Sequence, residues 1–132
     1  MKEIISGTYK TTNWHEQEHS QVEHGPRLTV AEKETAIEGG IQGKATLRYS
    51  TVYLSDGSNL FTGHMCIRGR IGDREGSLVV EDRGTGTADR ASGTWKILSG
   101  SASGDLVGLR GEGAWKSEKG NESVAYTLSY EL

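Results

Sequence analysis

The sequence predicts an all-β fold, an up-and-down barrel of eight antiparallel strands in one domain that spans residues 1–132. Apolar and polar residues alternate with a period of two along most of the chain, as in strands with one buried face. Glycines and short polar clusters separate these segments, and no long segment keeps the 3.6-residue period of a helix. Eight strands joined by short turns favour a barrel or a sandwich, and closure into a barrel removes aggregation-prone edges.

The N-terminal half of the chain contains four of the predicted strands. They cover residues 4–14, 28–38, 43–54 and 60–71. The third strand places Tyr49 and Tyr53 on one face. Asp56-Gly57 follows it and predicts a hairpin, because both residue types tolerate a positive φ. Residues 13–24 form the one stretch that the alternation leaves ambiguous.

The C-terminal half contains the other four strands. They cover residues 76–83, 92–99, 109–115 and 123–132. A glycine-rich segment joins the sixth strand to the seventh, in which Gly100 and Gly104 bracket a Ser/Ala/Ser turn. Gly111 and Gly113 leave space on the faces of the seventh strand, where another backbone or a large ring can approach.

A barrel of eight strands encloses little more than its own side chains or one small ligand. Period-two counting predicts a bulky, aromatic set of inward residues. These are Tyr9, Tyr49, Tyr53, Met65, Ile67, Leu78, Val80, Trp95, Ile97, Trp115, Tyr126 and Tyr130. Two interpretations stay open: the rings fill the barrel, or they line a cavity. In the second case the ligand-binding residues are Tyr49, Tyr53, Met65, Trp95, Trp115, Tyr126 and Tyr130.

Composition narrows the class of protein. The formal net charge of −3 is small, and no Lys/Arg run provides the footprint of a nucleic-acid or membrane-surface protein. Cys66 is the single cysteine, so no disulfide can form within the chain, which fits a reducing cytoplasm. The polar N-terminus and the lack of a long apolar run predict neither a signal peptide nor a membrane helix. We therefore expect a cytoplasmic protein without nucleic-acid or membrane partners.

The segment from His15 to His19 reads H-E-x-x-H, a pattern that binds zinc when it lies on a helix. Glu16 would then be the general base, and Glu23 or His24 the third ligand. The pattern instead continues a strand, on which His15 and His19 would lie about 13 Å apart. We therefore predict no metal site.

Two carboxylates are candidate catalytic residues. Asp82 shares a face with Leu78 and Val80, and burial in an apolar lumen would raise its pKa and suit it to acid–base chemistry. The alternative is that the fifth strand ends before Asp82, which is then a solvated turn residue. The alternative is favoured, because carboxylates are rarely buried without a partner. Glu16 poses the same question at the end of the first strand, with Trp14 as its neighbour.

The segment from Ser103 to Gly111, SGDLVGLRG, resembles the turn-and-strand signature of allene oxide cyclases and dirigent proteins. The whole chain is similar to a family of small bacterial proteins of unknown function that share that barrel. The further matching segments are Ser6–Tyr9, Trp14 with Glu16, Gly76–Leu78, Gly93–Trp95, the glycine run from Gly100 to Gly113, and Tyr126–Tyr130. The resemblance implies an eight-stranded barrel, often a homo-oligomer, whose lumen can hold an apolar molecule. It implies no known reaction.

Three classes of function follow from these features. The first is a barrel that binds a small apolar molecule, and no cofactor is expected. The second is a cyclase or isomerase that confines an apolar substrate, assisted by one lumen carboxylate. The third is an interaction or scaffold barrel with a packed lumen. Binding ranks first, because a lumen lined by rings with few polar groups suits orientation better than hydrolysis.

Overall fold

The computed structural model describes residues 2–21, 23 and 25–132, which form strands and turns and no helix. The strands are β1 (Glu3–Gln21), β2 (Arg27–Gly39), β3 (Ile41–Tyr53), β4 (Asn59–Ile71), β5 (Arg74–Gly86), β6 (Arg90–Ile97), β7 (Ser103–Gly104), β8 (Arg110–Glu118) and β9 (Val124–Glu131). Within the described part of the chain there is no helix with the length and apolar character needed to cross a membrane.

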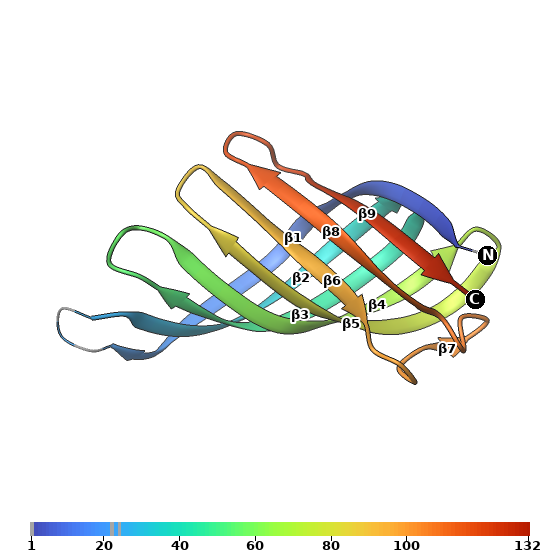
Figure 1. The fold of residues 1–132 in the computed structure, drawn as a ribbon, viewed down its shortest axis with the longest axis horizontal. Coiled ribbons are helices and arrows are strands. Elements are labelled where there is room, and N and C mark those ends of the chain that lie inside the picture. Colours follow the sequence, from blue (N-terminus) through green and yellow to red (C-terminus); the bar gives the residue numbers. More distant parts are fainter. Residues whose placement is uncertain (1, 22, 24) are drawn as a thin grey trace.

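Eight of these strands form a closed antiparallel barrel (Figure 1). Each strand pairs with the next along the chain, except that β6 pairs with β8, because β7 is a two-residue strand that adds only to β5. The pairing of β1 with β9 joins the first strand to the last and closes the sheet. The predicted fold class is therefore confirmed, and β7 is an addition that the alternation did not predict.

The barrel has two different ends (Figure 1). The hairpin end carries the connections β1–β2, β3–β4, β5–β6 and β8–β9. The terminal end carries both chain termini, the turns β2–β3 and β4–β5, and the long connection from β6 to β8. In that connection Leu106 and Leu109 are buried in the core, and Gly100 and Gly104 take positive φ values of 84° and 65°. The connection therefore folds back and closes the terminal end with apolar side chains.

Three strands continue well beyond the ends that the alternation predicted. Strand β1 continues to Gln21, so most of the ambiguous stretch 13–24 is strand, and residues 22 and 24 lie outside the described residues. Strand β5 continues to Gly86 and strand β8 to Glu118, each three residues beyond the predicted ends at 83 and 115. All three extensions lie toward the hairpin end, where they lengthen the wall of the barrel.

The predicted inward residues form most of the core. Ten of the twelve are buried, whereas Tyr49 and Tyr53 are half-buried near the hairpin end. Their inward position follows from the regular register of β3 with β2 and β4, which keeps the period-two alternation unbroken.

A bulge changes the face of β1 partway along the strand. The register with β2 shifts between Thr11 and Asn13, which makes Thr12 an extra residue without a partner in β2. One extra residue reverses the alternation beyond it. Trp14 and Glu16 therefore lie on the lumen side, whereas strict alternation from the start of β1 would place them outside.

Candidate functional site

Aromatic rings from three strands line the lumen near the hairpin end. Phe61 of β4 packs against Tyr49 of β3 in an edge-on arrangement, with ring centroids 5.7 Å apart. It also stacks on Trp115 of β8 at 5.5 Å. Glycines make room for these rings, since a Cβ added at Gly84 would lie 2.6 Å from Phe61 and one at Gly93 2.6 Å from Trp115. Large side chains at either glycine would displace the rings.

Trp14 extends this aromatic surface toward solvent. Its side chain is 54% exposed, and its indole Nε1 donates a hydrogen bond of 2.8 Å to the hydroxyl of Tyr49. Strand β1 can present Trp14 there only because the bulge at Thr12 has reversed its alternation. The mouth at the hairpin end therefore has an exposed aromatic rim.

Glu16 lies at the same mouth and is held by two hydroxyls. Its Oε2 accepts hydrogen bonds from Thr29 Oγ1 at 2.5 Å and from Tyr53 OH at 2.6 Å. Burial raises the pKa of Tyr53, and the hydrogen bond and negative charge of Glu16 raise it further. Glu16 thus positions Tyr53 in the wall. It is separate from the deeper polar groups described next.

The interpretation of Asp82 as a solvated turn residue is wrong. Strand β5 continues past it to Gly86, so Asp82 keeps its inward position and is 2% exposed. Its partner is Trp115, whose Nε1 donates a hydrogen bond of 2.8 Å to Oδ1. Burial raises the pKa of Asp82, whereas this hydrogen bond and the charge of Lys33 lower it by a smaller amount. The lumen therefore contains a carboxyl group that holds its proton more readily than an exposed one.

Lys33 is the residue that the sequence reasoning missed. It lies on β2, and its ammonium nitrogen is 6.0 Å from the ring centroid of Tyr9 and 5.8 Å from that of Tyr49. Burial lowers its pKa, and the charge of Asp82 partly opposes this effect. Alternate positions counted back from the buried Ile37 include Lys33, so the signal was present. The usual preference of lysine for solvent masked it.

Two buried polar atoms in the lumen wall lack hydrogen-bond partners among the described residues: Trp95 Nε1 and Thr35 Oγ1. Trp95 is 1% exposed and lies on β6 directly opposite Asp82. Its indole N–H is near enough to favour the charged form of Asp82, although it forms no hydrogen bond of good geometry. Unpaired buried donors are rare in native proteins and call for a physical explanation.

The predicted ligand-binding residues divide into three groups. Tyr49, Tyr53 and Trp115 contribute to the wall at the hairpin end, and Trp95 and Met65 are buried in the core. The hydroxyls of the other two residues have structural partners. Tyr126 donates to Glu38 O at 2.7 Å and accepts from Ile41 N–H at 3.0 Å. Tyr130 donates to Glu3 Oε2 at 2.7 Å. Burial and the bond to Glu3 raise the pKa of Tyr130 to about 12.

The two histidines of the H-E-x-x-H segment lie on the outer surface, whereas Glu16 faces the mouth of the barrel. Strand β1 runs through His15 and His19, so the segment does not form the helix that the zinc motif requires. Within the described residues no group of three or more His, Cys, Asp or Glu is placed to hold a metal ion, and His24 lies outside those residues. The prediction of no metal site stays a prediction.

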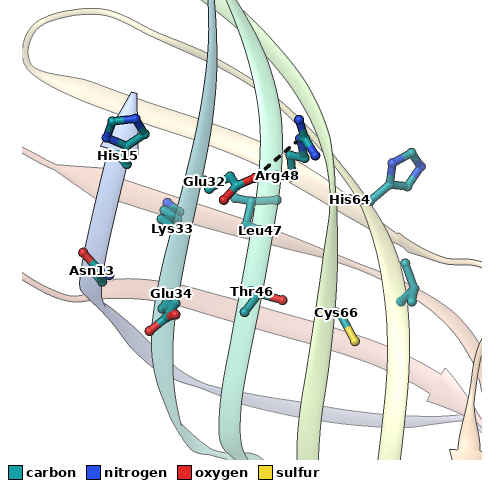
Figure 2. Close-up of a pocket in the computed structure, with 11 residues that line it drawn as sticks. Asn13, His15, Glu32, Lys33, Glu34, Thr46, Leu47, Arg48, His64 and Cys66 are labelled. Carbon is teal, nitrogen blue, oxygen red and sulfur yellow. Dashed lines mark ion pairs between the residues drawn. The ribbon is translucent and has the colours of Figure 1, made fainter. Parts of the chain in front are cut away.

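His15 instead lines a shallow groove of about 490 Å³ on the outside of the barrel (Figure 2). Glu32 and Arg48 form an ion pair of 3.7 Å across this groove, and His64 and Cys66 lie on the next strand. Both members of the ion pair are largely exposed, so their attraction is weak in water. Cys66 is also on the outer face.

Comparisons with known proteins agree on the fold and assign no activity. A family model described as "Protein of unknown function (DUF3224)" matches residues 5–130. A crystal structure of a DUF3224 protein of unknown function from Shewanella oneidensis MR-1 superposes with a TM-score of 0.79 at 18% identity. The match covers 100% of this chain and 98% of that one. At this identity the likeness shows the fold alone. Comparison with curated proteins gave no match.

Proposed function

Because this chain belongs to the DUF3224 family of proteins of unknown function, we propose a function from the geometry of its barrel. The barrel binds a small, largely apolar molecule at its hairpin end. The observation that carries the proposal is the exposed aromatic rim: Trp14 is 54% exposed and hydrogen-bonded to the half-buried Tyr49, which packs against the half-buried Phe61. Exposed aromatic surface beside a few convergent polar groups is typical of ligand sites.

The difference between the two ends supports this location. Leu106 and Leu109 close the terminal end with apolar side chains, and both are almost fully buried. The hydroxyl of Tyr126 is occupied by backbone groups. At the hairpin end, in contrast, Tyr49 and Tyr53 are only half-buried. A ligand there would cover apolar surface that now faces water, which contributes about 25 cal/mol per Å² covered.

The test uses N-phenyl-1-naphthylamine, a neutral apolar dye. We expect the dye to quench tryptophan emission saturably and to raise the melting temperature, because a ligand that binds only the folded state stabilises it. Tyr49→Ala should lower the affinity at least several-fold. Its matched control is Arg48→Ala on the opposite face of the same strand, which should leave affinity unchanged. Absence of both quenching and thermal shift would contradict the proposal and favour a scaffold barrel with a packed lumen.

Acid–base catalysis on a confined substrate is a second candidate function, and the burial of Asp82 favours it. Burial raises the pKa of Asp82, and a carboxyl group with a raised pKa next to an apolar ligand is suited to take up and return a proton. A bound molecule held in a reactive conformation would then isomerise or cyclise faster. The resemblance of the glycine run to allene oxide cyclases is consistent with this class of reaction and stays a prediction.

Hydrogen exchange of a bound ketone tests this second function. In D₂O, Asp82 would take a proton from the methyl group of 2-acetylnaphthalene, leave an enolate, and return a deuteron acquired from solvent. We expect the protein to accelerate loss of the methyl proton NMR signal, and Asp82→Asn to slow it by about a hundredfold or more. Glu81→Gln, on the outer face next to Asp82, is the control. Equal rates for Asp82→Asn and the native protein would exclude Asp82 as the base.

A further inference from the structure

The lumen contains more hydrogen-bond donors than it uses. The ammonium group of Lys33 contacts the faces of two tyrosine rings and has no carboxylate within 4 Å among the described residues. An ammonium group offers three N–H donors and no acceptor. Ring faces attract the positive charge but do not replace those hydrogen bonds. Lys33 thus has unused donors inside the barrel wall.

Trp95 provides a second unused donor. Its ring is stacked between Tyr9 and Tyr126, with centroids 5.8 Å and 5.4 Å away, so the indole orientation is restricted. Its Nε1 is buried without a partner among the described residues. Leaving such a group unpaired costs stability, and a bound acceptor would recover it.

The two donors lie near the same point of the lumen. Lys33 Nζ lies 6.0 Å from the ring centroid of Tyr9, and the ring of Trp95 is stacked on the same tyrosine at 5.8 Å. Trp95 is also the cross-strand partner of Asp82. Asp82 Oδ1 already accepts the hydrogen bond of Trp115 Nε1 at 2.8 Å. The carboxyl group of Asp82 therefore has one donor already, and the groups around it that lack partners are donors.

We propose that the ligand of the hairpin end carries a carbonyl or carboxylate oxygen that accepts hydrogen bonds from Lys33 Nζ and Trp95 Nε1. This inference rests on the proposed function and adds the chemistry of the ligand's polar end. The apolar body of the ligand lies against Tyr49, Phe61 and Trp115. The opposite charges of Lys33 and Asp82 make the site compatible with either kind of oxygen. A cationic ligand would meet the like charge of Lys33, and the nearby carboxyl group of Asp82 already accepts from Trp115, so such a ligand is disfavoured.

Four naphthalene probes test the polar end: naphthalene, 2-naphthoate, 2-acetylnaphthalene and 2-naphthylmethylamine. They share one ring system and differ in the group attached to it. Calorimetric titration should show the two oxygen probes binding about tenfold or more tightly than naphthalene and the amine. Comparison of 2-naphthoate with 2-acetylnaphthalene distinguishes a carboxylate from a ketone as the preferred acceptor.

Lys33→Met should abolish the preference for the oxygen probes and keep the binding of naphthalene. Lys44→Met on the exposed face of β3 is the matched control and should keep the preference. A second measurement needs no variant at Trp95. In a ¹⁵N-labelled native protein, the Nε1–H signal of Trp95 should move downfield with an oxygen probe and stay in place with naphthalene.

The outcomes separate this inference from the proposed function. If all four probes bind with equal affinity, the apolar site stands and the polar contact is wrong. The same conclusion follows if Lys33→Met keeps the preference, or if the Trp95 signal ignores the oxygen probes. If none of the four probes binds, both proposals fail. Tighter binding of oxygen probes that depends on Lys33 and moves the Trp95 signal supports both.

Discussion

At the scale of single residues, Asp82 shows how a barrel keeps a carboxyl group out of water. Strand pairing sets Asp82 opposite Gly63 on one side and Trp95 on the other. Gly63 has no side chain, and the indole of Trp115 donates to Oδ1. The space beside Gly63 and the hydrogen bond from Trp115 together accommodate the carboxyl group among the aromatic rings of the lumen. Its protonation then becomes coupled to folding.

The first prediction concerns that coupling. The pKa of Asp82 is raised above its ordinary value of 3.8, because burial disfavours the charged form. The folded protein therefore retains a proton that the unfolded chain releases. Its contribution to stability is complete below about pH 4 and is lost as pH rises through the folded-state pKa. In urea unfolding between about pH 4 and 7, the native protein should lose up to about 1.4 kcal/mol per pH unit relative to Asp82→Asn.

Asparagine is the suitable replacement, because its side-chain oxygen can still accept the hydrogen bond of Trp115 while it has no proton to release. The pKa of Lys33 is lowered by burial, so its own effect on stability has the opposite sign. It is present in both proteins and cancels in the difference, apart from the part that comes from the attraction between Lys33 and Asp82. Parallel stability curves for the two proteins would show that Asp82 titrates as it does in the unfolded chain.

At the scale of elements, two irregularities give the ends of the barrel their different character. The bulge at Thr12 in β1 brings Trp14 and Glu16 to the lumen side of the hairpin end. The connection between β6 and β8 folds over the terminal end, where Asp105 N–H donates to Glu75 O at 2.8 Å. The bulge adds aromatic and polar groups to the opening at the hairpin end. The β6–β8 connection closes the terminal end with apolar side chains.

The second prediction concerns that connection. Leu106 is 1% exposed, whereas the next residue, Val107, is 66% exposed. Leu106→Ala should lower the free energy of unfolding by about 2–5 kcal/mol, because it removes buried methyl groups and leaves a cavity. Val107→Ala should change it by no more than about 0.5 kcal/mol. Urea unfolding measures both. The dye affinity of folded Leu106→Ala should stay unchanged, since the two ends are separate. Equal effects of the two substitutions would mean that Leu106 does not close the barrel.

At the scale of the whole molecule, closure gives every strand of the barrel two neighbours. The pairing of β1 with β9 brings residues near the two termini together and joins sequence-distant halves into one wall. The described surface includes exposed apolar residues at the terminal end, such as Ile4 and Leu132. Assembly into a homo-oligomer stays a prediction. The fold itself is the same as that of the Shewanella relative.

Much of the fold follows from local sequence. Period-two alternation located the eight barrel strands, and Asp56-Gly57 marked a hairpin correctly, with Gly57 at a positive φ of 91°. Unbroken alternation also identified Tyr49, Trp95 and Trp115 as inward residues. These features depend on neighbours along the chain, so the sequence by itself determined them: a pleated strand turns successive side chains to opposite faces whatever surrounds it.

The candidate site was decided by tertiary structure. Counting along the chain could not reveal the bulge at Thr12, because an extra residue is visible only against the register of β2. Asp82 and Lys33 fall at inward positions of the alternation, but Asp and Lys side chains usually face solvent, so the alternation alone did not decide where they lie. Pairing with the neighbouring strands keeps both in the lumen. The cost of burying a charge depends on the partners available there. Those partners, including Trp115 for Asp82 and the tyrosine rings for Lys33, come together only when the sheet closes.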